Sequence, residues 1–288
     1  MTLNEPPKTI LLATDLSNRC DRALSRTAQL ATEWEANVIA ATIVEAEPDR
    51  LMDQRERKPR ATPIERARHT LDSHLADVEI SAKVYVATGD PLSILPSVAE
   101  EEDCEMIIMG TARTDALRGL LLGGTTKRLI KTLSAPVLVV HDRPAGRYRN
   151  ILVATDRSQG AREALLEVAR LFPDARLTLF YAHDFPTASN LGSNDRAMKD
   201  IDLRSEMLAE IIGDPHVSTD LAARLDLVVQ TGAVDRLVSE YAQDYGMDLT
   251  VVGSHGHGAI FEAIIGSTER KLLNTHVGDL LIVSSDES

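Results

Sequence analysis

A glycine-rich segment near the end of the chain has the residue types of an anion-binding site. It runs from Gly253 to Gly258 and is followed eight residues later by Gly266, Ser267 and Thr268. Glycine lets a ligand approach the backbone closely, and free backbone N–H groups at the start of a helix attract phosphate. The hydroxyl groups of Ser267 and Thr268 add hydrogen-bond donors. The segment therefore predicts a site for a phosphate-bearing ligand.

Other candidate positions lie at or near the ends of apolar runs, or within the glycine-rich segment. They are Ala154, Thr155, Asp156, Asp184, Val252, His255 and Gly256. The carboxylate of Asp156 could accept a hydrogen bond from an amino group or a sugar hydroxyl. Backbone groups near Asp184 could read the edge of a base. These positions predict a slot for a planar group beside the anion site.

The pattern of the chain also predicts the framework that would gather these residues. Short β-branched runs alternate with amphipathic stretches, which is typical of a parallel sheet covered by helices on both faces. Right-handed crossovers favour a doubly wound, Rossmann-like α/β order, in which ligands bind at the carboxyl ends of the strands. We expect strands at 9–14, 37–44, 83–88, 105–110, 136–141, 150–155, 176–182, 226–231, 248–253 and 278–284. Helices of the later part are expected at 159–171, 195–212, 233–245 and 267–275.

The chain contains this order of elements twice. The segment ILLATD at 10–15 recurs as ILVATD at 151–156, and MIIMGT at 106–111 parallels LTVVGS at 249–254. Steady offsets of this kind over most of each half indicate an internal repeat.

Two five-stranded domains follow from the repeat, one over 1–142 and one over 149–288. The terminal apolar runs of the two halves, 136–141 and 279–285, are edge-strand candidates that would risk aggregation if left open. We therefore expect the two domains to pair within the chain about a pseudo-twofold axis. A homodimer of two chains is a further option.

The second half resembles the universal stress protein family. The spacing Gly253-x2-Gly256-x9-Gly266-Ser267 matches the G-x2-G-x9-G-[ST] motif of the ATP-binding members, and the opening ILVATDRS is also similar. The resemblance covers nearly all of both halves, so the chain is similar to a tandem member.

The resemblance implies an adenosine nucleotide, which could be ATP, ADP or AMP, held with Mg²⁺ and without a P-loop. Asp156 and the backbone near Asp184 would then face the adenine and the ribose. The ribose and phosphates would be lined by Gly253, Gly256, Gly266 and Ser267, with Thr268 nearby.

The first half departs from the motif. Arg113 stands where the second motif glycine should be, and a second glycine follows Gly123 in place of the Ser or Thr, although Thr125 comes next. We expect a degenerate or altered site there. Gly110 and Asp15 remain at the ends of their strands, so an adenine-like ligand stays open for this half.

Several other interpretations compete with nucleotide binding. Asp15 and Asp156 could cap the turns that follow them. His255 and His257 could bind zinc with His183, but no third ligand is certain and no cysteine or carboxylate cluster supports them. The letters HGHG resemble the HxGH motif of adenylyltransferases, which belongs after a first strand rather than a fourth. No catalytic residue can be named.

Composition narrows the function further. A net charge of −13 argues against a broad nucleic-acid footprint. No apolar run approaches the roughly 18 residues of a membrane span. The N-terminal sequence is a poor signal peptide, and the two cysteines form no disulfide framework. We expect a cytoplasmic location.

The favoured hypothesis is a stress-response regulatory protein that binds nucleotide and acts on an unknown protein partner. Any hydrolysis should be slow, because no general base is in evidence. The alternative is an interaction protein whose vestigial site is empty or holds a small or lipid-like ligand. An ATPase or adenylyl transferase ranks last.

Overall fold

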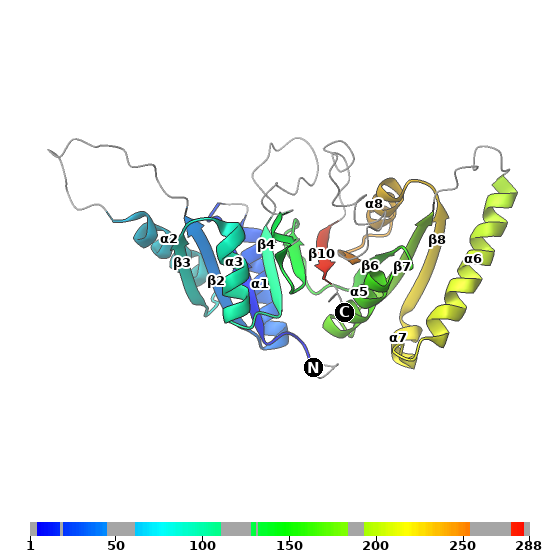
Figure 1. Ribbon diagram of the computed structural model, residues 1–288, viewed down its shortest axis with the longest axis horizontal. Coiled ribbons are helices and arrows are strands. Elements are labelled where there is room, and N and C mark those ends of the chain that lie inside the picture. Colours follow the sequence, from blue (N-terminus) through cyan, green and yellow to red (C-terminus); the bar gives the residue numbers. More distant parts are fainter. Residues whose placement is uncertain are drawn as a thin grey trace. The chain divides into compact units, whose positions relative to one another are not determined.

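The computed structural model in Figure 1 describes residues 5–17, 20–44, 61–110, 128–130, 132–183, 193–253 and 278–284. These residues divide into two compact units, which we call the first half (7–110 and 128–144) and the second half (5–6 and 145–284). The predictions at Arg113, Gly123, Thr125, Asp184, His255, Gly256, Gly266, Ser267 and Thr268, and for a helix at 267–275, lie outside the described residues.

The first half is a parallel five-stranded sheet with the strand order β3-β2-β1-β4-β5. Its strands are β1 (Thr9–Ala13), β2 (Asn37–Val44), β3 (Lys83–Thr88), β4 (Met106–Gly110) and β5 (Val137–Val140). Its helices include α1 (Cys20–Trp34), α2 (Pro63–Asp77) and α3 (Pro91–Glu101). Because β1 pairs with both β2 and β4, the strand order reverses at β1.

The second half repeats this plan with the strand order β8-β7-β6-β9-β10, again all parallel. Its strands are β6 (Asn150–Thr155), β7 (Arg176–His183), β8 (Leu225–Thr231), β9 (Leu249–Gly253) and β10 (Asp279–Val283). Its helices include α5 (Gln159–Leu171), α6 (Ser193–Gly213), α7 (Thr219–Ala223) and α8 (Val234–Asp244). The short helix α7 was not predicted.

The doubly wound α/β prediction is confirmed, and every predicted strand is present to within two residues at each end. The central strands are buried along almost their whole length, as the unbroken apolar runs indicated. Helix α5 packs over β6, β9 and β10, while α8 packs on β7. The sheet core of each half therefore lies beneath its helices.

Local capping fixes where several helices begin. Thr62 and Glu65 form a reciprocal capping box at the start of α2, with Pro63 in the first turn. Ser158 and Ser218 cap α5 and α7 through their hydroxyl oxygens. Within the described part of the chain, no helix combines the length and apolar character that crossing a membrane requires.

Candidate functional site

The strand order of the second half brings two candidate segments together at one edge of the sheet. Strand β6 pairs with β7 on one side and with β9 on the other, so the order reverses between β6 and β9. The last paired residues are Val153 and Val251. Just beyond them, β6 ends at Thr155, followed by Asp156, and β9 ends at Gly253. This is the position at which doubly wound sheets bind ligands.

A tight turn connects β6 to α5 and fixes Asp156. The Thr155 hydroxyl accepts a hydrogen bond from the Arg157 N–H (3.1 Å), and Asp156 Oδ1 accepts one from the Ser158 N–H (3.0 Å). Arg157 has a φ of +65°, a conformation that a non-glycine residue adopts at some cost. A carboxylate has about four acceptor positions, so the bond to Ser158 leaves Asp156 capacity for a ligand.

The first half builds nearly the same turn after β1. The Leu16 N–H donates to the Thr14 hydroxyl (3.0 Å), the Ser17 N–H donates to Asp15 Oδ1 (2.9 Å), and Leu16 has a φ of +59°. Cys20 Sγ also lies 3.1 Å from Asp15 Oδ1. Burial raises the pKa of the Cys20 thiol, which favours its role as a donor. Both aspartates thus stabilise the turns that follow them, as the alternative interpretation proposed.

Gly253 lies directly against the first turn of α5. A Cβ atom added to Gly253 would lie 2.5 Å from the carbonyl oxygen of Gly160 and 3.0 Å from the nitrogen of Ala161. A Cβ atom at this distance would force the backbone of Gly160 to move, so position 253 requires glycine for packing whether or not a ligand binds. At least one glycine of the motif is therefore needed for packing of the fold.

The remaining predicted positions at this edge are buried. Ala154 and Val252 are 1% and 0% exposed, and Thr155 is 4% exposed. Any contact that Ala154 or Val252 makes with a ligand would come from the backbone. In the first half, Gly110 ends β4 beside β1 in the corresponding place.

A polar cluster that sequence reasoning missed lies at the ends of β7 and β8. His183 Nε2 is 2.8 Å from Asp200 Oδ1, and the Thr231 hydroxyl donates to the same oxygen at 2.9 Å. His183 was considered only as a zinc ligand. Asp200 comes from α6, 17 residues away, so spacing alone gave no signal for this contact.

The two halves differ at this cluster. His183 and Val44 hold equivalent positions, because each carbonyl accepts the N–H of a matching glycine, Gly232 and Gly89. The first half therefore has an apolar side chain where the second has an imidazole. Among the described residues, no group of three or more His, Cys, Asp or Glu is arranged to hold a metal ion.

Comparison with known proteins relates both halves of the chain to one protein family. The sequence profile of the universal stress protein family matches residues 7–141 and 147–284. A universal stress protein of Mycobacterium bovis is 24% identical over 208 residues, which cover 69% of this chain and 68% of the relative. Universal stress protein A homolog 2 of Coxiella burnetii is 28% identical over 142 residues, covering 47% of this chain and 94% of the relative.

Solved structures extend the likeness to the fold. A universal stress protein from Archaeoglobus fulgidus superposes with a TM-score of 0.62 at 16% identity, covering 98% of each chain. A protein described as functionally unknown, from Pseudomonas aeruginosa, superposes with a TM-score of 0.64 at 18% identity, covering 96% of this chain and 92% of that one. At these identities, the likeness concerns the fold alone.

Proposed function

This chain belongs to the universal stress protein family, and we propose that its second half binds an adenosine nucleotide. ATP is the ligand expected first, with ADP and AMP as alternatives, and Mg²⁺ would accompany the phosphates. Binding would serve regulation rather than turnover, because no side chain in the sequence is marked as a general base.

One observation carries the proposal. The glycine motif begins at the end of β9, and β9 neighbours β6 at the point where the strand order reverses. A ligand held by the motif would thus meet Thr155 and Asp156, which follow β6 at the same edge. The motif spacing and the strand order are independent features, and both support a ligand at one place.

The proposed roles follow from the chemistry of each residue type. Asp156 would accept a hydrogen bond from the ribose or the base. Gly256 and Gly266 would allow the phosphates to approach the backbone. Ser267 and Thr268 would offer hydroxyl and backbone donors to the phosphate oxygens. Asp184 and His255 would border the nucleotide through backbone groups.

The first half offers a built-in comparison. Its turn at Asp15 matches the turn at Asp156, yet Arg113 replaces the second motif glycine. A side chain at that position would crowd a nucleotide that needs close backbone approach. We therefore propose one nucleotide per chain, bound in the second half.

Isothermal titration of nucleotide-stripped protein with ATP and Mg²⁺ tests this proposal. The wild-type chain should bind one ATP. Gly256→Arg, which gives the second half the residue of the first, should abolish binding. Arg113→Gly is the matched control, because it changes the equivalent position and should leave the second-half site intact.

Two results would contradict the proposal. One is the absence of binding by ATP, ADP and AMP to a stripped protein with a native circular dichroism spectrum. The other is an unchanged affinity in a folded Gly256→Arg variant. The first result would favour the interaction-protein hypothesis, whereas the second would mean that ATP binds somewhere other than the second-half glycine motif.

A further inference from the structure

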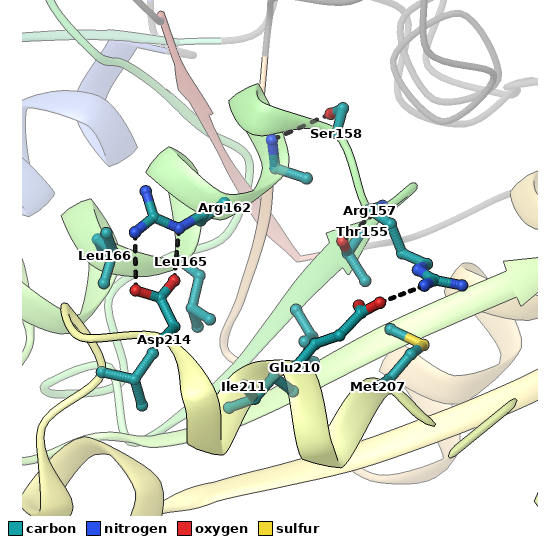
Figure 2. Close-up of a pocket in the computed structure, with 13 residues that line it drawn as sticks. Thr155, Arg157, Ser158, Arg162, Leu165, Leu166, Met207, Glu210, Ile211 and Asp214 are labelled. Atoms are coloured by element: carbon teal, nitrogen blue, oxygen red, sulfur yellow. Dashed lines mark hydrogen bonds and ion pairs between the residues drawn. The ribbon is translucent and has the colours of Figure 1, made fainter. Parts of the chain in front are cut away.

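A cavity of about 130 Å³ lies between α5 and α6 in the second half, beside the turn that follows β6. Its apolar wall comes from both helices, from β7 and from the segment after α6. The larger apolar side chains are Leu165, Leu166, Leu179, Met207, Ile211 and Val217. In Figure 2, Leu165 and Ile211 lie between the Arg162–Asp214 and Arg157–Glu210 ion pairs.

The cavity exists because α6 contributes few buried side chains to the space between itself and the sheet. In the equivalent helix α2 of the first half, Ala67, Leu71 and Leu75 are buried, and α2 packs on both β2 and β3. Among the described side chains of α6, Met207 is the one that is fully buried, and α6 packs on β8. Space therefore remains over β7, whereas side chains of α2 cover the equivalent strand β2 in the first half.

Three arginine–carboxylate ion pairs bridge the two elements at this point. Arg157, in the turn before α5, donates to Glu206 (2.7 Å) and Glu210 (2.5 Å) of α6. Arg162 of α5 donates to both oxygens of Asp214, at 2.5 and 2.8 Å. Each arginine side chain spans the gap between the helices (Figure 2). The cavity is thus preformed, and a ligand would not need to separate packed surfaces.

The charges around the cavity indicate what kind of ligand it takes. Both arginines are already neutralised by carboxylates, Arg157 by Glu206 and Glu210 and Arg162 by Asp214, so the cavity presents no unpaired charge of this kind to an anion or a cation. The base of the cavity is dry in character, since Leu165, Leu179 and Met207 are 4%, 5% and 3% exposed. Water is poorly held where it lacks two or more polar partners.

We propose that this cavity binds a small uncharged apolar molecule, of the size of a single aromatic ring with one or two substituents. An apolar cavity of roughly 150 Å³ holds benzene in another protein, and the volume here is similar. The site is separate from the proposed nucleotide site, although the turn at Thr155–Ser158 contributes to both.

Toluene is a suitable probe, and Met207 is a built-in reporter. In the full chain labelled with ¹³C at the methionine methyl groups, the Met207 signal is assigned by its loss in Met207→Leu. Toluene should shift this signal saturably, with a dissociation constant on the order of 0.1 to 1 mM. Benzoate, which has the same ring and a negative charge, should shift it at least about tenfold less strongly at equal concentration.

A pair of adjacent substitutions provides the control. Ile211→Trp places a large side chain into the cavity and should weaken toluene binding at least about tenfold. Ile212→Trp adds the same side chain to a residue that is 75% exposed and should leave binding unchanged. If Ile211→Trp fails to give a native spectrum, Val217→Phe serves as the second filling variant.

The proposal is overturned if toluene leaves the Met207 methyl signal in place, or if it shifts that signal equally in Ile211→Trp and Ile212→Trp. It is also overturned if benzoate binds as well as toluene, because the site would then select for an anion.

Discussion

Arg162 of α5 donates two hydrogen bonds, of 2.5 and 2.8 Å, to the carboxylate of Asp214, which lies 52 residues further along the chain. The guanidinium, and after it the backbone N–H of His216, hold the pKa of Asp214 well below its ordinary value of 3.8. A carboxyl group with a lowered folded-state pKa stabilises the protein above its unfolded pKa. That contribution is lost as the pH falls through the folded value.

Asp214→Asn should therefore lower the free energy of unfolding by about 1 kcal/mol at pH 7, since the pair is partly exposed and screened by solvent. The difference from wild type should persist down to about pH 4 and narrow below it. Urea denaturation at pH 7, 5 and 3 measures this. Asp220→Asn is the control, because that carboxylate is 89% exposed and 3.9 Å from Arg224. A difference that grows on acidification would contradict the argument.

Gly253→Ala should destabilise the second half by about 1–3 kcal/mol, because the new methyl group would meet the backbone of Gly160. Thermal unfolding monitored by circular dichroism measures the loss. Gly213→Ala is the matched control, since no atom lies within 4 Å of the Cβ it would gain. Equal melting temperatures for the two variants would show that the close contact is relieved at no cost. Because of this contact, Gly253 is a poor position at which to test nucleotide binding.

Asp156→Ala and Asp15→Ala separate ligand binding from turn formation. Both variants lose the backbone N–H bond that closes a turn of nearly the same geometry, and Asp15→Ala also loses the Cys20 contact, so each should cost about 1 kcal/mol of stability or more. Only Asp156→Ala should also weaken ATP binding, by about tenfold or more, because it removes a charged acceptor from the proposed site. Titration calorimetry and urea denaturation of both variants provide the two readouts. Equal affinity in the two variants would argue that neither aspartate contacts nucleotide.

Tyr148→Phe removes a buried hydrogen bond between the segment preceding β6 and the start of β10. The Tyr148 hydroxyl lies 2.5 Å from Asp279 Oδ2, and Asp279 is 0% exposed. Loss of a donor to a buried carboxylate should cost about 1–3 kcal/mol, measured by urea denaturation. Tyr245→Phe removes a hydroxyl from a residue that is 64% exposed and should cost far less. Similar losses of unfolding free energy in both variants would show that burial does not strengthen the Tyr148–Asp279 hydrogen bond.

The strands could be predicted from the sequence because each buried strand reads as an unbroken apolar run bounded by turn residues. The helix α7 was missed because five residues are too few to show helical periodicity. Asp156 and Gly253 could be placed at one edge because strand ends converge in a doubly wound sheet.

The cavity and its ion pairs could not be predicted in the same way. Arg157 and Glu206 are 49 residues apart, and nothing in the spacing of two surface charges tells which partner each will find. The number of α6 side chains that reach the core depends on how that helix sits over β8, which periodicity does not determine. Contacts between elements depend on the tertiary structure, which the local sequence pattern predicts poorly.

The matching turns at Asp15 and Asp156 bear on how a duplicated domain loses an activity. Residues that shape the backbone survive divergence for reasons of folding, so Thr14 and Asp15 would persist in a half that no longer binds anything. A survey that scores such residues will count too many ligand sites in tandem proteins. Positions where the two halves differ in sequence are more informative, and the second glycine of the motif is one of them, with Arg113 in the first half and Gly256 in the second.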